Sequence, residues 1–532
     1  MTSKLRVGVL LRSLQCQNWA ARALQQIQQS DAAEVVSVLL DHSRHETNSS
    51  LDWHSALFRM WSKLDRNLNG RTGDAFGNCE LPSVLKNACR IEVSSSDKSP
   101  SPQWLKHVAA ANLDVILALD GAPQVNRICS CAKYGVWYLN SVNNEQDMTA
   151  PMFWAAYCQS PVFNADVVAA TNDGEKLICR SITPTNDVSL YLGQSSTCWK
   201  GGELLVRRLR DLKRYGWDYL QSVDPQRNAQ LSLPDNATTA KFLLRWFGDA
   251  LRYEFNYRVR KDQWFVAYRR NRGVVPSSLQ EMGGFRIVTP PRDRFFADPF
   301  VVTRAGKSYI FIEDYFYKKK KGLISCIEID ERGECGKAEV VLEAPYHLSY
   351  PFVFEHGGEW YMIPETRENL TVELYRAVDF PRRWVLEKVL LKNVPAVDST
   401  VFMHEGRVWL FLGGMAEKVS PNDELFLFSA DSLFGDWRPH PRNPIVSDVR
   451  SARPAGALFF QNGQLIRPAQ DCSTRYGFAV VFNRVDLLSE SDYREAPIGR
   501  IPRQWCSGNQ GTHTFNQNEA YQVVDGRMLI FK

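Results

Sequence analysis

Five polar residues recur at nearly even spacing in the second half of the chain. They are Asp298, Tyr350, Asp398, Arg453 and His513, which lie 52, 48, 55 and 60 residues apart. Carboxylates can act as acids, bases or nucleophiles, arginine binds anions, and histidine titrates near neutral pH. If these groups met in one place, they could carry out acid–base chemistry on a bound anionic substrate.

Each of these residues begins a copy of the same short sequence motif. A short apolar run follows it, then a turn and a second apolar run, as in Asp298-Pro-Phe-Val-Val and Tyr309-Ile-Phe-Ile-Glu313. Paired strands around a tight turn, repeated about every 50 residues, are typical of β-propeller blades. Five copies therefore predict an all-β five-bladed β-propeller. Because blades surround one axis, equivalent residues should converge on one central funnel.

The first half of the chain has a different period. Apolar runs at 4–12, 35–40 and 113–119 alternate with segments of helical spacing, such as 18–28 and 104–111. Strands that alternate with helices predict a doubly wound α/β domain. We expect the following organisation: an α/β domain at 1–221 that contains an insertion or mobile loop at 42–102, a connection at 222–284, and the propeller at 285–532.

Composition limits the function classes. The chain has 532 residues and a net charge of +5, which is too small to favour nucleic acid as a partner. We expect no membrane span, because no apolar run has the necessary length. The N-terminus lacks a secretory pattern and the twelve cysteines are scattered, so we expect a cytoplasmic protein with reduced thiols and no metal site. No glycine-rich phosphate loop follows the first strand, so we expect no dinucleotide cofactor.

The α/β half resembles a formyltransferase domain. The phrases that carry this resemblance are DVILALDGA at 114–122, KYGVWYLN at 133–140 and APMFWAAY at 150–157. That family uses an Asn-x-His pair after the equivalent strand, and this chain has Asn140-Ser-Val there. The resemblance therefore implies a formyltransferase-like fold that is inactive for formyl transfer.

The second half resembles the glucosamine inositolphosphorylceramide transferase N-terminal type of propeller. The phrases are FFADPF at 295–300, YPFVF and YMIPE within 350–365, VDSTVF at 397–402, SARPAGALF at 451–459 and GTHTFN at 511–516. More distantly, it is similar to five-bladed glycosidases of the arabinanase and xylosidase kind. Those enzymes use a base, a second Asp that tunes a pKa, and a general acid Glu in a later blade, where this chain has Arg453.

These comparisons assign candidate catalytic roles. Asp298 is the candidate base, Asp398 is the carboxylate that tunes a pKa or orients the sugar, and Glu365 is the substitute acid. His513 is a further acid, base or hydrogen-bond donor. The alternatives are that Asp298 only forms a turn and that Glu365 only pairs with an arginine.

A second group of residues is expected to bind substrate. Arginines suit a phosphate, a carboxylate or a sugar nucleotide. The candidates are Arg453, Arg467, Gln470, Asp471, Tyr350 and Glu313.

Three functions remain open. The first is a carbohydrate-active enzyme that cleaves or transfers a glycosyl group on an anionic or nucleotide-linked sugar, in glycan or glycolipid assembly. The second is a non-catalytic protein that binds a glycan or sugar nucleotide, and the third is an N-formyl or acyl transferase. The expected ligand is a sugar, a sugar phosphate or a sugar nucleotide, and the sequence leaves the oligomeric state open.

Overall fold

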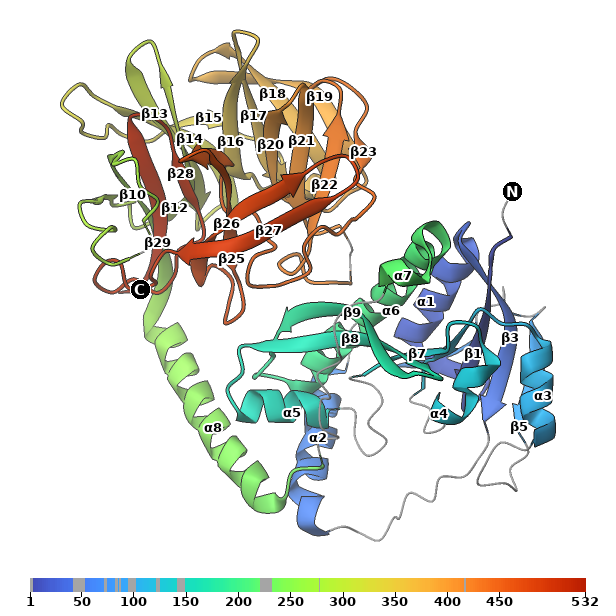
Figure 1. The fold of residues 1–532 in the computed structure, drawn as a ribbon. Helices are drawn as coiled ribbons and strands as arrows, with labels where there is room; N and C mark the ends of the chain where they lie inside the picture. The colour runs from blue at the N-terminus through green and yellow to red at the C-terminus, as the bar shows by residue number, and fades with distance from the viewer. Residues whose placement is uncertain are drawn as a thin grey trace. The chain divides into compact units, whose positions relative to one another are not determined.

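The structure is a computed structural model that describes residues 3–41, 53–70, 74–81, 85, 88–93, 102–120, 125–140, 149–220, 232–276, 278–415 and 418–532. The chain divides into two compact units, Met1–Ala250 and Leu251–Lys532. Figure 1 colours the first from blue to green and the second from green to red.

A seven-stranded sheet forms the centre of the first unit, in the order β5-β3-β1-β6-β7-β8-β9. The first five strands of that order run parallel, whereas β8 and β9 are antiparallel to their neighbours. The strands are β1 (Leu5–Leu11), β3 (Ala33–Asp41), β5 (Cys89–Val93), β6 (Val115–Ala118), β7 (Val136–Leu139), β8 (Val162–Thr171) and β9 (Gly174–Pro184).

Helices cover both faces of this sheet. On one face, α1 (Asn18–Gln29) and α6 (Leu190–Tyr215) bury apolar side chains against alternate residues of β1. On the other face, α3 (Pro102–Ala110) packs Trp104 against the intervening residues. The predicted doubly wound α/β fold is therefore confirmed, and continuous apolar strands follow because both faces are buried.

Shorter elements complete the first unit. They are β2 (Gln15–Gln17), β4 (Asn78–Glu80), α2 (Ala56–Asn69), α4 (Val125–Ile128), α5 (Ala150–Tyr157), α7 (Trp217–Leu220) and the 3-10 turns Trp53–Ser55 and Cys129–Cys131. The helix α8 (Asn236–Val259) leads into the second unit. Within the segment predicted as an insertion, 42–102, the structure describes 53–70, 74–81, 85, 88–93 and 102, which include α2, β4 and β5, and the remaining residues lie outside the described ranges.

The described residues of the second unit form five four-stranded sheets, one for each blade. Blade 1 holds β12 (Arg294–Arg304), β13 (Lys307–Phe316), β14 (Lys321–Ile329) and β15 (Glu339–Leu342). Blade 2 holds β16 (Ser349–His356), β17 (Glu359–Thr366), β18 (Thr371–Asp379) and β19 (Arg383–Lys392). Blade 3 holds β20 (Val397–His404), β21 (Arg407–Gly413), β22 (Leu425–Ala430) and β23 (Arg438–Pro439). Blade 4 holds β24 (Phe459–Gln461), β25 (Gln464–Asp471), β26 (Ala479–Leu488) and β27 (Tyr493–Arg500). The predicted five-bladed propeller is confirmed.

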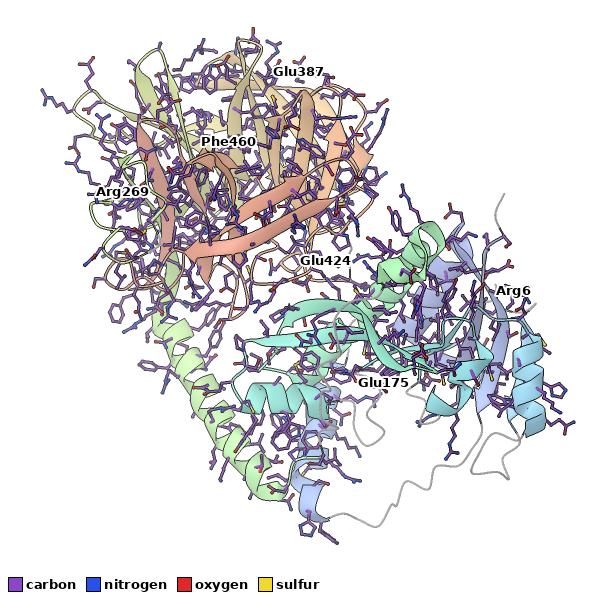
Figure 2. The ribbon with its side chains drawn as sticks, viewed as in Figure 1. Arg6, Glu175, Arg269, Glu387, Glu424 and Phe460 are labelled. Carbon is purple, nitrogen blue, oxygen red and sulfur yellow. The ribbon has the colours of Figure 1, made fainter. Side chains whose placement is uncertain are left out.

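Blade 5 joins the two ends of the propeller. It combines β28 (Phe515–Gln517) and β29 (Tyr521–Phe531) with β10 (Arg260–Arg270) and β11 (Arg286–Val288). Strands β10 and β29 pair along eleven residues, and Arg269 (Figure 2) adds a bond from its Nε to the Gln522 side chain at 2.8 Å. The segment assigned from the sequence as a connection thus contains a strand of the propeller.

Tight turns connect the inner strands of the blades to their neighbours. At Ala305-Gly306, Glu405-Gly406 and Asn462-Gly463 both central residues have positive φ. This is the backbone of a type I′ turn, whose twist matches that of paired strands. The repeated turns of the sequence therefore become the hairpins that build the blades.

Neighbouring blades pack through apolar faces. One core cluster joins Phe311 and Ile324 of blade 1 to Met362 and Trp384 of blade 2. Another joins Val523 and Val266 of blade 5 to Ile310 of blade 1. Since this second cluster closes the ring, the stability of the propeller depends on the pairing of β10 with β29.

The closure gives a first prediction. Val523→Asp places a carboxylate in a fully buried position of β29 and should lower the free energy of unfolding by about 4 kcal/mol or more. Leu529→Asp, on the same strand at a position that is 37% exposed, should cost about 1 kcal/mol or less. Chemical denaturation followed by tryptophan fluorescence would measure both. Equal losses in the two variants would contradict the closure argument.

Candidate functional site

The three polar residues that begin blades 1, 2 and 3 share one unusual backbone conformation. Asp298, Tyr350 and Asp398 have φ values of +50°, +45° and +50°. In each blade the register of the inner strand shifts at this residue, so each residue lies in a β-bulge. A side chain as large as Tyr rarely adopts positive φ, and bulges re-aim side chains next to functional sites.

Carboxylates hold these bulges together from blade to blade. The Tyr350 N–H donates to Asp298 Oδ2 at 3.1 Å, and the Asp298 N–H donates to Asp525 Oδ2 at 3.3 Å. The Asp398 N–H donates to Glu365 Oε2 at 3.2 Å. Each bulge N–H is therefore bound by a carboxylate of the preceding blade, in the order 5 to 1, 1 to 2 and 2 to 3.

Blade 4 joins this arrangement through an arginine. Arg453 Nε donates to Asp398 Oδ2 at 2.6 Å, and its Nη1 donates to Asn422 Oδ1 at 2.9 Å. Its Nη2 lies 3.6 Å from Glu365 Oε2, and Gln470 donates a further hydrogen bond to Asp398 Oδ2 at 2.9 Å. The guanidinium is thus committed to partners within the protein.

Blade 5 contributes a buried histidine between two carboxylates. His513 Nδ1 lies 2.5 Å from Asp525 Oδ2, and His513 Nε2 lies 3.4 Å from Asp298 Oδ1. Burial alone would lower the pKa of His513, but Asp525 and Asp298 outweigh it and raise that pKa. Among the described residues, Asp298, His513 and Asp525 also form a set whose ligand atoms lie within 4.8 Å of one another, close enough to hold a metal ion.

The carboxyl groups of the centre differ in pKa. Burial, together with the charges of Asp398 and Asp525, raises the pKa of Asp298 to about 6, against the opposing effect of His513. Burial and the charge of Asp398 raise the pKa of Glu365 to about 8, although Arg453 opposes this. Burial and the neighbouring carboxylates raise the pKa of Glu313 well above its usual value. Glu313 lies 3.4 Å from His347 Nε2.

One exposed aromatic ring lies over this centre. Tyr476 is 41% exposed, and its ring centroid lies 4.8 Å from the Arg453 guanidinium carbon and 5.3 Å from the His513 ring. It belongs to the loop between β25 and β26, at the end of blade 4 where Arg453 also lies. The centre therefore meets solvent beneath an aromatic side chain.

The structure brings most of the predicted site residues together. Contacts or charge connect seven of them: Asp298, Glu313, Glu365, Asp398, Arg453, Gln470 and His513. Tyr350 contributes its N–H to Asp298, while its hydroxyl bonds Thr400 at 2.8 Å and accepts the Gly456 N–H at 2.8 Å. Because both ends of Tyr350 have internal partners and its side chain is fully buried, it braces the centre.

Two predicted residues lie apart from this group. Arg467 pairs with Glu495 at 2.6 Å and donates to the Ser451 carbonyl at 2.6 Å. Asp471 accepts from the Ser473 N–H at 3.0 Å and lies 3.9 Å from Arg500. Arg467 lies an odd number of residues from Gln470 on one strand, so its side chain points to the opposite face of the sheet from Gln470. Substrate binding by Arg467 stays a prediction.

Sequence reasoning missed Asp525, which orients His513 and holds the Asp298 bulge. It ends the second run of the fifth repeat, in the place where Glu313 and Glu365 end theirs. That equivalence was the available signal. Asn422, which binds Arg453, lies in a long loop of blade 3 and carries no repeat signal.

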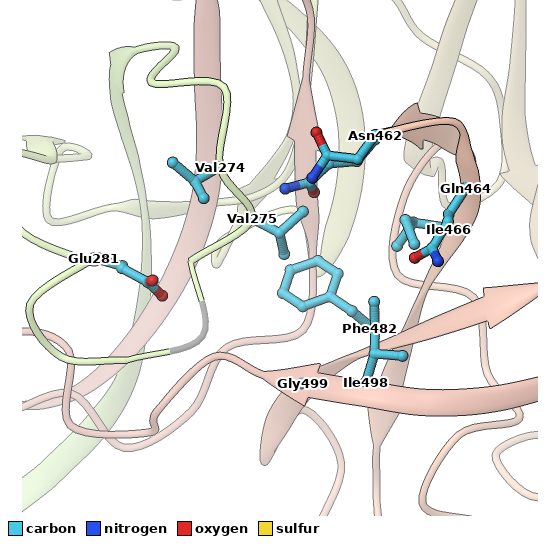
Figure 3. Close-up of a pocket in the computed structure, with 10 residues that line it drawn as sticks. Val274, Val275, Glu281, Asn462, Gln464, Ile466, Phe482, Ile498 and Gly499 are labelled. Carbon is cyan, nitrogen blue, oxygen red and sulfur yellow. The ribbon is translucent and has the colours of Figure 1, made fainter.

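A separate pocket of about 260 Å³ lies at the other end of blade 4 (Figure 3). Val275, Ile466, Phe482 and Ile498 are among its apolar lining residues, and Asn462 and Gln464 are among its polar ones. It contains none of the predicted site residues, so the centre around Asp298 remains the candidate site.

Comparison with known proteins confirms the family resemblance of the second half. Residues 288–527 match the family described as glucosamine inositolphosphorylceramide transferase 1, N-terminal. The chain is 38% identical over 229 residues to glucosamine inositolphosphorylceramide transferase 1 of Arabidopsis thaliana, covering 42% of this chain and 29% of that protein. It is 36% identical over 208 residues to the protein of the same name in Oryza sativa subsp. japonica, covering 38% and 28%. The chain thus spans less than a third of the length of these relatives.

Solved structures with a similar chain path include two glycosidases. RS223 β-xylosidase has a TM-score of 0.34 and 11% identity, covering 44% of this chain and 92% of that chain. An exo-β-1,3-galactanase from Clostridium thermocellum has a TM-score of 0.33 and 12% identity, covering 44% and 59%.

The predicted cytoplasmic location is contradicted by the match to relatives named glucosamine inositolphosphorylceramide transferase 1. In the described parts of the chain, no helix has the length and apolar character needed to cross a membrane. The formyltransferase resemblance of residues 1–221 stays a prediction.

The Asp398–Arg453 pair gives a second prediction. Arg453→Met leaves the buried Asp398 carboxylate without its cation and should lower the free energy of unfolding by about 3–5 kcal/mol. The double variant Arg453→Met/Asp398→Asn removes both charges and should be more stable than the single variant. Urea denaturation of the wild type, both single variants and the double variant would give the coupling energy. Additive losses would mean that the two groups do not depend on each other.

Proposed function

We propose that the propeller centre binds a sugar and cleaves or transfers its glycosyl group, with Glu365 as general acid and Asp298 as general base. One observation carries the proposal. In a single buried centre, the pKa of Asp298 is about 6 and that of Glu365 is about 8. At neutral pH the first is therefore ionised and the second protonated.

This division of states is what glycosyl chemistry needs. A protonated carboxyl gives its proton to the leaving oxygen, while an ionised carboxylate activates water or an acceptor hydroxyl, or attacks the sugar. Environments that push two carboxyl pKa values apart assign these roles. Of the two side chains, Glu365 is the more accessible, at 11% exposed against 5% for Asp298. Glu365 is thus better placed to meet a leaving group.

Asp398 acts through its neighbours in this proposal. Its charge raises the pKa of Glu365, and Arg453 Nε donates a hydrogen bond to one of its oxygens at 2.6 Å. The Nε2 atom of His513 faces Asp298, and the Nδ1 atom of the same ring faces Asp525, which orients it. Asp398 and His513 are therefore positioning residues, whereas Asp298 and Glu365 would touch the reacting atoms.

The ligand is proposed to be a sugar, more specifically an anionic or nucleotide-linked sugar used in glycan or glycolipid assembly. Two observations support this. The exposed Tyr476 ring offers a flat apolar face beside the centre. The relatives are named glucosamine inositolphosphorylceramide transferase 1, a name that contains both an amino sugar and a phosphorylated lipid.

The pKa values predict a bell-shaped dependence of kcat/KM on pH. Activity should rise as Asp298 ionises near pH 6 and fall as Glu365 loses its proton near pH 8. Nitrophenyl glycosides and nucleotide sugars, assayed from pH 5 to 9, would provide the profile. Asp298→Asn and Glu365→Gln should each lower the rate on the order of 10² to 10⁴-fold. A flat profile in the wild type would contradict the assignment.

Substrates with different leaving groups distinguish the general-acid role of Glu365 from the general-base role of Asp298. Glu365→Gln should retain more activity on a nitrophenyl glycoside than on an alkyl glycoside, because nitrophenolate leaves without a proton. Asp298→Asn should lose activity on both. Glu387→Gln, which changes an exposed carboxylate on β19 paired with Arg376, is the matched control and should leave the rates unchanged.

A second candidate is sugar binding without turnover. It is favoured by the internal partners of Asp298, whose two oxygens accept the Tyr350 N–H and the Thr514 hydroxyl at 3.1 and 2.8 Å. On this alternative Asp298 serves only to join blades 1, 2 and 5. Saturable binding of a sugar with no turnover in the wild type would support it over the enzyme.

A further inference from the structure

A group of arginines lies beside the proposed centre, outside the residues that the proposed reaction uses. Arg475 belongs to the β25–β26 loop, Arg503 to the segment after β27, and Arg527 to β29. Although they are far apart in sequence, two residues connect them. The Arg475 side chain donates to the Gln510 carbonyl, and the Gln510 N–H donates to the Arg527 carbonyl at 2.6 Å.

The neighbouring residue completes the connection. The Asn509 side chain donates to the Arg503 carbonyl at 2.6 Å and accepts the Arg527 N–H at 2.9 Å. These bonds involve backbone atoms of Arg503 and Arg527, so they fix where the two side chains start without using the guanidinium groups. Three cations are thus held together by the backbone of two loops and a strand.

Negative charge near these cations is scarce. Asp262 Oδ2 lies 3.5 Å from Arg527 Nη1. Across the described ranges, no carboxylate oxygen lies within 4.0 Å of a nitrogen of Arg475 or Arg503. The Nε atoms of Arg475 and Arg527 are buried and have no hydrogen-bond partner in the described part of the chain. Such donors are costly to leave unpaired.

The electrostatics agree with this geometry. Burial first, then the charges of Arg527 and Arg503, lower the pKa of Arg475 to about 10. Arg503 also lies over the Phe478 ring, 5.6 Å from its centroid. A cluster of cations that repel one another and keep free donors is stabilised when an anion binds, and planar guanidinium groups match the oxygens of a phosphate.

We propose that Arg475, Arg503 and Arg527 form a binding site for the phosphate group of a phosphate mono- or diester. Arg475 directly precedes Tyr476, whose ring lies over Arg453 and His513. A phosphate held by the arginines would therefore place an attached sugar at the centre. Only the placement of the attached sugar rests on the proposed function. Phosphate binding by the three arginines does not depend on whether the centre catalyses a reaction.

The chemistry fits two sources of phosphate. One is the diphosphate of a nucleotide sugar, and the other is the headgroup of a phosphorylated glycolipid. Uridine diphosphate serves as the probe for the first source and myo-inositol 1-phosphate as the probe for the second. Inorganic phosphate tests the group that both share, and uncharged uridine and myo-inositol are the controls.

The test is calorimetric titration of the full chain at low ionic strength, together with thermal unfolding with and without each probe. At least one phosphate probe should bind and raise the melting temperature of the wild type, and binding should weaken with salt. Arg475→Gln should weaken that binding about tenfold or more. Arg475→Lys, which keeps the charge but not the planar fork, should weaken it less.

Arg332→Gln is the matched control, because it removes the same charge from an exposed turn of blade 1 and should leave binding unchanged. Arg503→Gln provides a second variant if Arg475→Gln does not fold. The inference is overturned if no phosphate probe binds the wild type, or if the cluster variants bind as the wild type does. Phosphate binding without turnover would count against the proposed reaction alone, and turnover of neutral sugars without phosphate binding would count against this site alone.

Discussion

The bond between a carboxylate of one blade and the bulge N–H of the next is the interaction on which the centre of the propeller depends. It occurs from Asp525 to Asp298, from Asp298 to Tyr350 and from Glu365 to Asp398. A bulge leaves its extra residue outside the strand ladder, and a buried N–H without a partner is costly. The carboxylates meet that need, and the bulges in turn aim side chains at the axis.

The same interaction explains the titration behaviour of the centre. Carboxylates that are drawn together to bind amides become buried and repel one another, which raises the pKa of Asp298 and Glu365. Arg453 supplies compensating positive charge beside Asp398, and His513, when protonated, does so between Asp525 and Asp298. A structural need for carboxylates on the axis therefore produces a pair with opposite protonation states at neutral pH, which is the state an acid–base mechanism requires.

Further positive charge lies beside the centre, outside the residues that form it. The Arg453 guanidinium is bound to Asp398, so it is not free to donate hydrogen bonds to an anionic ligand. Backbone bonds hold Arg475, Arg503 and Arg527 in place, and across the described ranges Asp262, beside Arg527, is the one carboxylate within 4.0 Å of their side-chain nitrogens. Cations within the centre thus balance its acids, whereas cations beside it remain available to a ligand.

The sequence by itself determined the repeat, the hairpins and most members of the centre. A period near 50 residues, turns such as Asn462-Gly463 and polar starts such as Asp298 are local properties, and repetition around an axis carries equivalent residues to one place. The alternation of β25 also contained the reason that Arg467 points away from Gln470. The fifth repeat already placed Asp525 where Glu313 and Glu365 stand.

Only the tertiary structure decided which atoms meet. Blade 5 forms from β10 and β29, strands more than 250 residues apart, and the bulges change the direction of the side chains at Asp298 and Asp398 without changing the period. The pairing of Arg453 with Asp398, and the gathering of three arginines from separate segments, follow from that closure. Local pattern sets which face a residue occupies, but its partner depends on contacts between segments that no local pattern connects.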